Sequence, residues 1–139
     1  MKIAIGYKIV NGPWGGGNRF AADLKDALVS FGHSVKFDLK DKDIDIILLT
    51  DPRALSPSVS FSYGAILRYL LFTNSKSIVV HRINECDERK NTNHMNKALL
   101  RANWCADHTV FVGTWLTKLS SWENYFNDNY SVILNGSNK

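Results

Sequence analysis

Apolar residues occur along the chain in two alternating patterns, short continuous runs and longer stretches with helical spacing. The short runs predict strands at residues 2–10, 34–39, 43–50, 77–83, 108–113 and 130–136. The helical spacing predicts helices at 18–31, 61–73, 92–106 and 115–122. Strands that alternate with helices over connections of this length predict a parallel sheet covered on both faces. We therefore expect one Rossmann-like, doubly wound α/β domain over residues 1–139.

The first predicted helix carries signals at both ends. Asn18 is a suitable N-cap, and Gly32 stands where a helix end favours a left-handed residue. The loop before this helix, "NGPWGGGNR", contains three successive glycines and Trp14. In doubly wound folds ligands bind beyond the carboxyl ends of the strands, and the first strand-to-helix loop is a preferred place.

The glycines of this loop predict close approach of a ligand to the backbone. Gly15, Gly16 and Gly17 can present N–H groups, and the following helix offers its positive end to an anion. The P-loop pattern fails, because Asn18 and Arg19 follow the last glycine in place of Lys and Ser or Thr. A turn without any ligand stays open.

A dinucleotide-binding fingerprint is a further alternative for the same loop. Its third glycine would fall on Phe20, and Asp38 at the end of the second predicted strand would supply the acidic residue. Trp14 could stack on a sugar face, or it could pack against the domain.

A second polar stretch, "HRINECDERK", begins at the end of the fourth predicted strand. We expect His81 and Arg82, at the strand tip, to face the same crevice as the glycines. Arg82 or Arg89 could bind a phosphate or carboxylate as a fork, and Asp87 or Glu88 could bind hydroxyl groups or act as a base. The alternative is a solvated helix entry in which the two acids complement the helix dipole and the basic residues pair locally.

Composition and charge narrow the classes of partner. The chain has 139 residues, of which 45% are hydrophobic and 22% charged, as in an ordinary globular domain. The net charge of +4 allows an anionic partner. Lys and Arg are spread along the chain, and "KFDLKDKDID" mixes both signs, so we predict no nucleic-acid partner. The basic excess permits peripheral contact with an anionic membrane surface.

The two cysteines favour a reducing, cytoplasmic setting, because they are too few for a disulfide framework. The apolar stretch "YGAILRYLLF" is too short to span a membrane, and no secretory signal is visible. Cys105 with His108, and His81 with Cys86, match no ordinary zinc-ligand spacing, so we predict no metal site.

Four stretches resemble the N-terminal domain of GT-B glycosyltransferases of the family 4 group. The opening residues 1–37 are similar to that family's first strand, glycine-rich loop, long helix and G-H-x-V return, here Gly32 to Val35. "ADHTVFVGTWLTKL" is similar to its A-D-strand-S-x-W/F-L segment, and "VHRINECDERK" to its strand-four tip. "SVILNGSNK" resembles the V-I-x-N-G-V-D stretch that closes that domain, with Ser137 and Asn138 in place of V-D. The likeness runs in order along the whole chain.

The resemblance implies an enzyme that transfers a hexose from a nucleotide sugar to a carbohydrate or lipid-linked acceptor with retention, without a metal or other cofactor. Residues 1–139 would be the acceptor-side half of a GT-B fold, with the C-terminal donor-binding domain absent and the isolated chain inactive. A stand-alone Rossmann-type module that binds a nucleotide or sugar without catalysis is the alternative. A fragment of a dinucleotide-dependent oxidoreductase, resting on Asp38, is a third hypothesis.

The resemblance also implies roles for individual residues. His81 would be catalytic, near the reacting sugar. The loop residues Gly15, Gly16, Gly17, Asn18 and Arg19 would bind the phosphates of the donor. The acceptor side would be formed by Trp14, Arg82, Asn84, Asp87, Glu88 and Arg89.

Overall fold

A computed structural model describes residues 1–12, 15–53, 55–119 and 129–136 of the chain. Within them, six parallel strands form one sheet in the order β2-β1-β3-β4-β5-β6. The strands are β1 (Lys2–Ile5), β2 (Ser34–Lys36), β3 (Ile46–Leu49), β4 (Ile78–Ile83), β5 (His108–Phe111) and β6 (Tyr130–Val132). The helices are α1 (Gly16–Ser30), α2 (Tyr63–Phe72), α3 (Asp87–Lys90), α4 (Met95–Asn103) and the 3-10 helix η1 (Thr114–Lys118).

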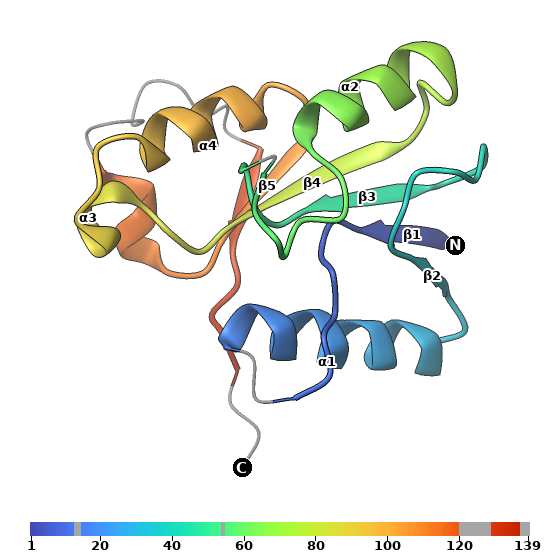
Figure 1. Ribbon diagram of the computed structural model, residues 1–139, viewed down its shortest axis with the longest axis horizontal. Helices are drawn as coiled ribbons and strands as arrows, with labels where there is room; N and C mark the ends of the chain where they lie inside the picture. Colours follow the sequence, from blue (N-terminus) through green and yellow to red (C-terminus); the bar gives the residue numbers. More distant parts are fainter. Residues whose placement is uncertain (13–14, 54, 120–128, 137–139) are drawn as a thin grey trace.

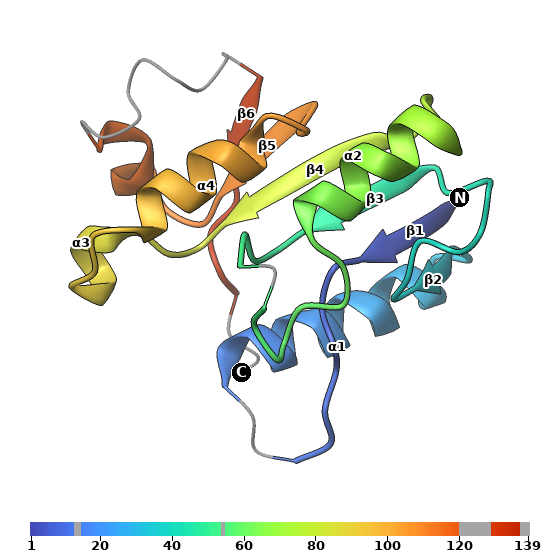
Figure 2. The same ribbon diagram turned by 45° about the horizontal axis from the view of Figure 1, so that its top comes forward.

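Helices cover both faces of the sheet. In Figure 1 and Figure 2, α1 lies on one face, and α2 and α4 lie side by side on the other. This arrangement confirms the predicted Rossmann-like, doubly wound α/β fold. The strand order reverses between β1 and β3, so the loops that leave these two strands separate toward opposite faces and open a crevice at the carboxyl edge of the sheet.

The main core lies between the central strands and the helices α2 and α4. Ile47 and Leu49 of β3 and Val79 of β4 are fully buried against Ile66 of α2. Each such aliphatic side chain contributes roughly 1.5–3 kcal/mol by leaving water. A second cluster, formed by Ile83, Met95, Leu99, Phe111 and Leu116, joins the tip of β4 to α4 and η1. The carboxyl ends of the strands are therefore a rigid platform.

Several predicted boundaries are wrong. The first strand ends at Ile5 and not at residue 10, because the chain turns into the crevice there. The helix predicted at 92–106 is shorter and corresponds to α4 alone. The short helix α3, which was not predicted, precedes it, and Asn91, with φ of 52°, lies between the two. The first helix was predicted to include residue 31, yet Phe31 follows the last turn of α1 and is 77% exposed.

Of the two end signals predicted for the first helix, the structure confirms only the one at the C-terminus. Gly32 has φ of +80°, which confirms its predicted place at the helix C-terminus. The predicted N-cap is wrong: the helix begins at Gly16, Gly15 is its N-cap, and Asn18 lies inside the first turn. The structure has the 3-10 helix η1 where a helix was predicted at 115–122. Residues 120–122 of that prediction lie outside the described residues. No described helix combines the length and apolarity that crossing a membrane requires.

Candidate functional site

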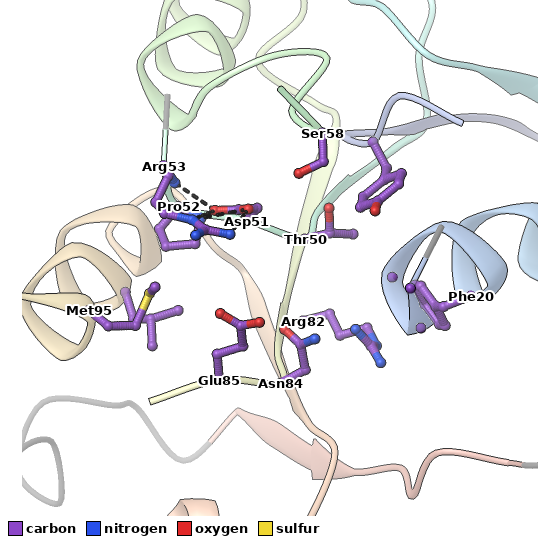
Figure 3. A pocket seen from close by; sticks show the side chains of 15 residues that line it. Phe20, Thr50, Asp51, Pro52, Arg53, Ser58, Arg82, Asn84, Glu85 and Met95 are labelled. Carbon is purple, nitrogen blue, oxygen red and sulfur yellow. Dashed lines mark hydrogen bonds and ion pairs between the residues drawn. The ribbon is translucent and has the colours of Figure 1, made fainter. Parts of the chain in front are cut away.

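Two adjoining cavities open at the carboxyl edge of the sheet. The inner pocket, of about 260 Å³, lies between the loops that follow β1 and β3. The outer pocket, of about 750 Å³, extends along α1 toward α3 and the segment after β6. Their shared wall is formed by Gly16, Gly17, Phe20, Arg82, Asn84 and Glu85. We call the two together the cleft, and Figure 3 shows the inner pocket from close by.

The glycine loop is fixed by hydrogen bonds on both sides. Asn18 uses its amide side chain twice, accepting from the Val10 N–H and donating to the Val10 carbonyl, each at 2.8 Å. The Lys8 N–H donates to the Ser58 carbonyl in the loop after β3, also at 2.8 Å. Asn18 lines neither pocket, so it positions the loop rather than contacting a ligand in the cleft.

The start of α1 lines the cleft with Gly16 and Gly17. A Cβ atom placed on Gly16 would meet no atom within 4 Å, so packing does not demand glycine at that position. Among the described residues, none accepts from the Gly16 or Gly17 amide, no side chain caps the helix and no acid lies in its first turn. An uncapped helix N-terminus is electropositive and suits an anion.

Arg82 places a buried cation beside this helix end. Its side chain extends from β4 over the Phe20 ring of α1, with the guanidinium carbon 3.8 Å from the ring centroid. Its Nη2 donates to Asn135 Oδ1 at 2.7 Å, and the residue is 7% exposed. Burial lowers the Arg82 pKa to about 10, so the group stays protonated at neutral pH.

The charge of Arg82 has no carboxylate partner in the part of the chain that the structure describes. The other charges along the cleft are largely paired: Arg19 with Asp23 at 3.5 Å and Lys90 with Glu85 at 3.2 Å. A buried guanidinium that lines a cavity without an ion-pair partner is suited to bind a phosphate or carboxylate of a ligand.

The inner pocket contains a bidentate ion pair. Asp51, 8% exposed at the end of β3, accepts from Arg53 Nε at 2.9 Å and from Arg53 Nη2 at 2.6 Å. Hydrogen bonding to Asp51 raises the pKa of Arg53 above its usual value. In Figure 3, dashed lines join this pair, and Arg82 extends from the β4 side toward Phe20.

His81 does not face the cleft, and this expectation is wrong. Neighbouring residues of a strand point to opposite faces, so His81 lies on the α4 side when Arg82 lies on the α1 side. Its ring is fully buried; Nδ1 lies 2.9 Å from Asn103 Oδ1, and Nε2 has no partner among the described residues. Burial lowers the pKa of His81 to about 4, against the opposing effect of the Asn103 hydrogen bond. In this position the ring does not touch a ligand in the cleft.

The acids of the strand-four loop have a structural use. Asp87 accepts hydrogen bonds from the Thr92 hydroxyl and from the amides of His94, Met95 and Asn96 at the start of α4. The Asn96 side chain donates to Glu88 at 3.0 Å. Neither acid lines a pocket, contrary to the predicted acceptor-side role. The alternative of a helix entry with acids at its start describes these two residues better.

The remaining predicted residues divide between the cleft and other places. Arg89 lines the outer pocket and donates to the Asn84 carbonyl at 2.9 Å, and Asn84 lines both pockets. Asp38 accepts from the Lys40 amide and lines neither pocket, which removes the support for a dinucleotide fingerprint. Trp14 lies outside the described residues. No described group of three His, Cys, Asp or Glu side chains could hold a metal ion.

Several cleft residues were missed in the sequence. Asp51 and Arg53 directly follow the buried run at β3, so the preference of ligands for strand tips, applied to this strand too, would have found them. Asn135 was missed for another reason: the last strand was predicted to extend to residue 136, whereas β6 ends at Val132, so Asn135 follows the strand tip. No protein-family model matches the chain, and no curated protein matches it significantly.

Proposed function

We propose that the chain is the acceptor-side domain of a glycosyltransferase that transfers a hexose from a nucleotide sugar with retention of configuration. The order of four motifs along the chain supports this proposal, as does the Rossmann-like fold. The observation that carries it is the pairing of Arg82, buried without a carboxylate partner among the described residues, with the open N-terminus of α1. Both groups would bind the phosphates that every nucleotide sugar carries.

Under this proposal, individual residues of the cleft have distinct roles in binding the phosphates. The amides of Gly16 and Gly17 would donate to the oxygens of one phosphate. The Arg82 guanidinium would donate two parallel hydrogen bonds to the oxygens of another phosphate. Phe20 holds the guanidinium in place, so little side-chain freedom is lost on binding. Arg89 would add positive charge at the mouth of the outer pocket.

Affinity measurements on the 139-residue chain test the proposal. UDP-glucose, GDP-mannose and NADH would be titrated by calorimetry into the wild type, Arg82→Gln, Arg82→Lys and Arg68→Gln. Arg68 is exposed on α2 and lines neither pocket, so its variant is a matched control for loss of one charge. We expect a nucleotide sugar to bind about 10- to 100-fold more weakly to Arg82→Gln, less so to Arg82→Lys, and equally to the control. Equal affinity for all four proteins, or preference for NADH, would contradict the proposal.

A stand-alone binding module is the second candidate, and one observation favours it. His81, which the resemblance places beside the reacting sugar, is fully buried on the opposite face of β4. The intact mass of the gene product isolated from its source distinguishes the candidates. A mass well above 15.7 kDa would favour a two-domain transferase, and a mass equal to it would favour binding without catalysis.

We also propose a cytoplasmic location, with peripheral membrane contact where the acceptor is lipid-linked. Cys86 and Cys105 are both buried as free thiols, which suits a reducing compartment. The basic excess of the chain would attract an anionic leaflet.

A further inference from the structure

The two pockets of the cleft differ in how their charges are balanced. In the outer pocket, Arg82 and Arg89 have no carboxylate partner among the described residues. The inner pocket is lined by Asp51 and Arg53, which form a bidentate pair, and by Glu85 and Arg82, so its two negative and two positive side chains balance. The inner pocket therefore favours a neutral group, whereas the outer one favours an anion.

The inner pocket offers both donors and acceptors to a neutral ligand. The Asp51 carboxylate accepts from the main-chain N–H, Nε and Nη2 of Arg53, so about one of its roughly four acceptor positions stays open to a ligand. The Thr50 hydroxyl donates to the Gly6 carbonyl at 3.1 Å and can still accept, and Ser58 adds a further hydroxyl. Hydroxyl groups on a ligand can donate to the Asp51 carboxylate and to the Thr50 and Ser58 hydroxyls. They can also accept from the free N–H groups of Arg53.

The size of the pocket limits the ligand to one small ring. Its volume of about 260 Å³ lies below the roughly 300–1,000 Å³ of sites that hold drug-sized molecules. Phe20, Met95 and Leu99 supply apolar surface to the same pocket, which suits the C–H face of a sugar. Arg82 lines both pockets, so a ring in the inner pocket can carry an anionic substituent that reaches the guanidinium.

We propose that the inner pocket is a subsite for one neutral monosaccharide ring, held by the Asp51–Arg53 pair, whose attached phosphate binds Arg82 and the N-terminus of α1. This inference rests on the proposed function and makes it more specific, because it names a glycosyl phosphate as the group bound. The same chemistry occurs in the nucleotide-sugar donor and in a sugar-phosphate acceptor.

Amide chemical shifts and affinities of the ¹⁵N-labelled 139-residue chain test the subsite. The probes are inorganic phosphate, glucose, glucose 1-phosphate and UDP-glucose. We expect phosphate to move the Gly16 and Gly17 amides, and glucose 1-phosphate to move the Thr50 and Ser58 amides as well while binding about tenfold more tightly than phosphate. Tighter binding of UDP-glucose than of glucose 1-phosphate would assign the subsite to the donor, and equal affinity would assign it to a sugar-phosphate acceptor.

Asp51→Asn separates the sugar from the phosphate. It removes a negative charge near the anion, so phosphate should bind equally well or better, whereas glucose 1-phosphate should lose its tenfold advantage. Ser58→Ala is a milder change that replaces Asp51→Asn in this test if that variant does not fold. It should reduce the advantage of glucose 1-phosphate in part. Asp26→Asn, which removes an exposed acid of α1 outside both pockets, is the control and should leave the ratio unchanged.

Two results would overturn the inference, and they differ. If phosphate moves Gly16 and Gly17 but glucose 1-phosphate binds no more tightly and leaves Thr50 and Ser58 unmoved, the sugar subsite is wrong and the proposed function stands. If neither phosphate nor UDP-glucose moves Gly16 and Gly17, the proposed function fails together with the subsite.

Discussion

The loop after β1 and the polar stretch at the tip of β4 make opposite uses of their hydrogen-bonding groups. The first loop brings Gly16 and Gly17 to the wall of the cleft, and no described residue accepts from their amides. The second stretch contains more ionisable residues, but most of them bind the protein itself: Asp87 caps α4, and Lys90 pairs with Glu85 at 3.2 Å. A dense run of charges therefore does not by itself locate a site, since what matters is which groups remain free for a ligand.

The largest expected effect concerns His81, whose role we assign to the fold. Its pKa is about 4 in the folded chain against 6.5 when unfolded, so the unfolded state binds more protons between these values. The free energy of unfolding should therefore fall by about 3 kcal/mol as the pH decreases from 6.5 to 4. Urea unfolding across this range measures it, and His81→Gln should flatten the curve. An equally steep curve for the variant would show that another group is responsible.

Asp87→Ala should lower the free energy of unfolding by about 2 kcal/mol, because α4 loses the carboxylate that caps it. Burial alone would raise the pKa of Asp87, but hydrogen bonds from Thr92 and the α4 amides outweigh it and lower the pKa. This stabilisation is present above the unfolded pKa near 3.8 and is lost as the pH falls through the lower folded value. Asp87→Asn should lose less than Asp87→Ala. Weaker UDP-glucose binding with an unchanged urea midpoint would instead place Asp87 in the binding site.

Gly16→Val tests the loop after β1 and should reduce ligand binding rather than stability. The added side chain meets no protein atom within 4 Å, so we expect less than about 1 kcal/mol change in stability. It would fill the space in which a ligand approaches the backbone, and UDP-glucose affinity should fall at least about tenfold. Gly64→Val, at an open position on α2 outside the cleft, is the matched control. A destabilised Gly16→Val protein with normal affinity would show that the glycine is structural.

The fold could be predicted further than the site. The alternation of apolar runs and helical stripes is a local property, and it placed each described strand and the parallel sheet. The side to which His81 points could not be predicted, because β4 is buried on both faces and shows no alternation of polar and apolar residues. The N-cap failed for a similar reason: Asn18 has the right chemistry for a cap, but its partner is Val10, across the loop.

The chemical shifts of the Arg82 Nε–H group and of the Gly16 and Gly17 amides, followed while UDP-glucose is added to the 139-residue chain, test the central claim most directly. If the cleft binds the phosphates of a nucleotide sugar, the three signals should move together and fit one dissociation constant. If they stay in place while UDP-glucose reaches millimolar concentration, or if only signals remote from the cleft move, the assignment of this cleft is wrong.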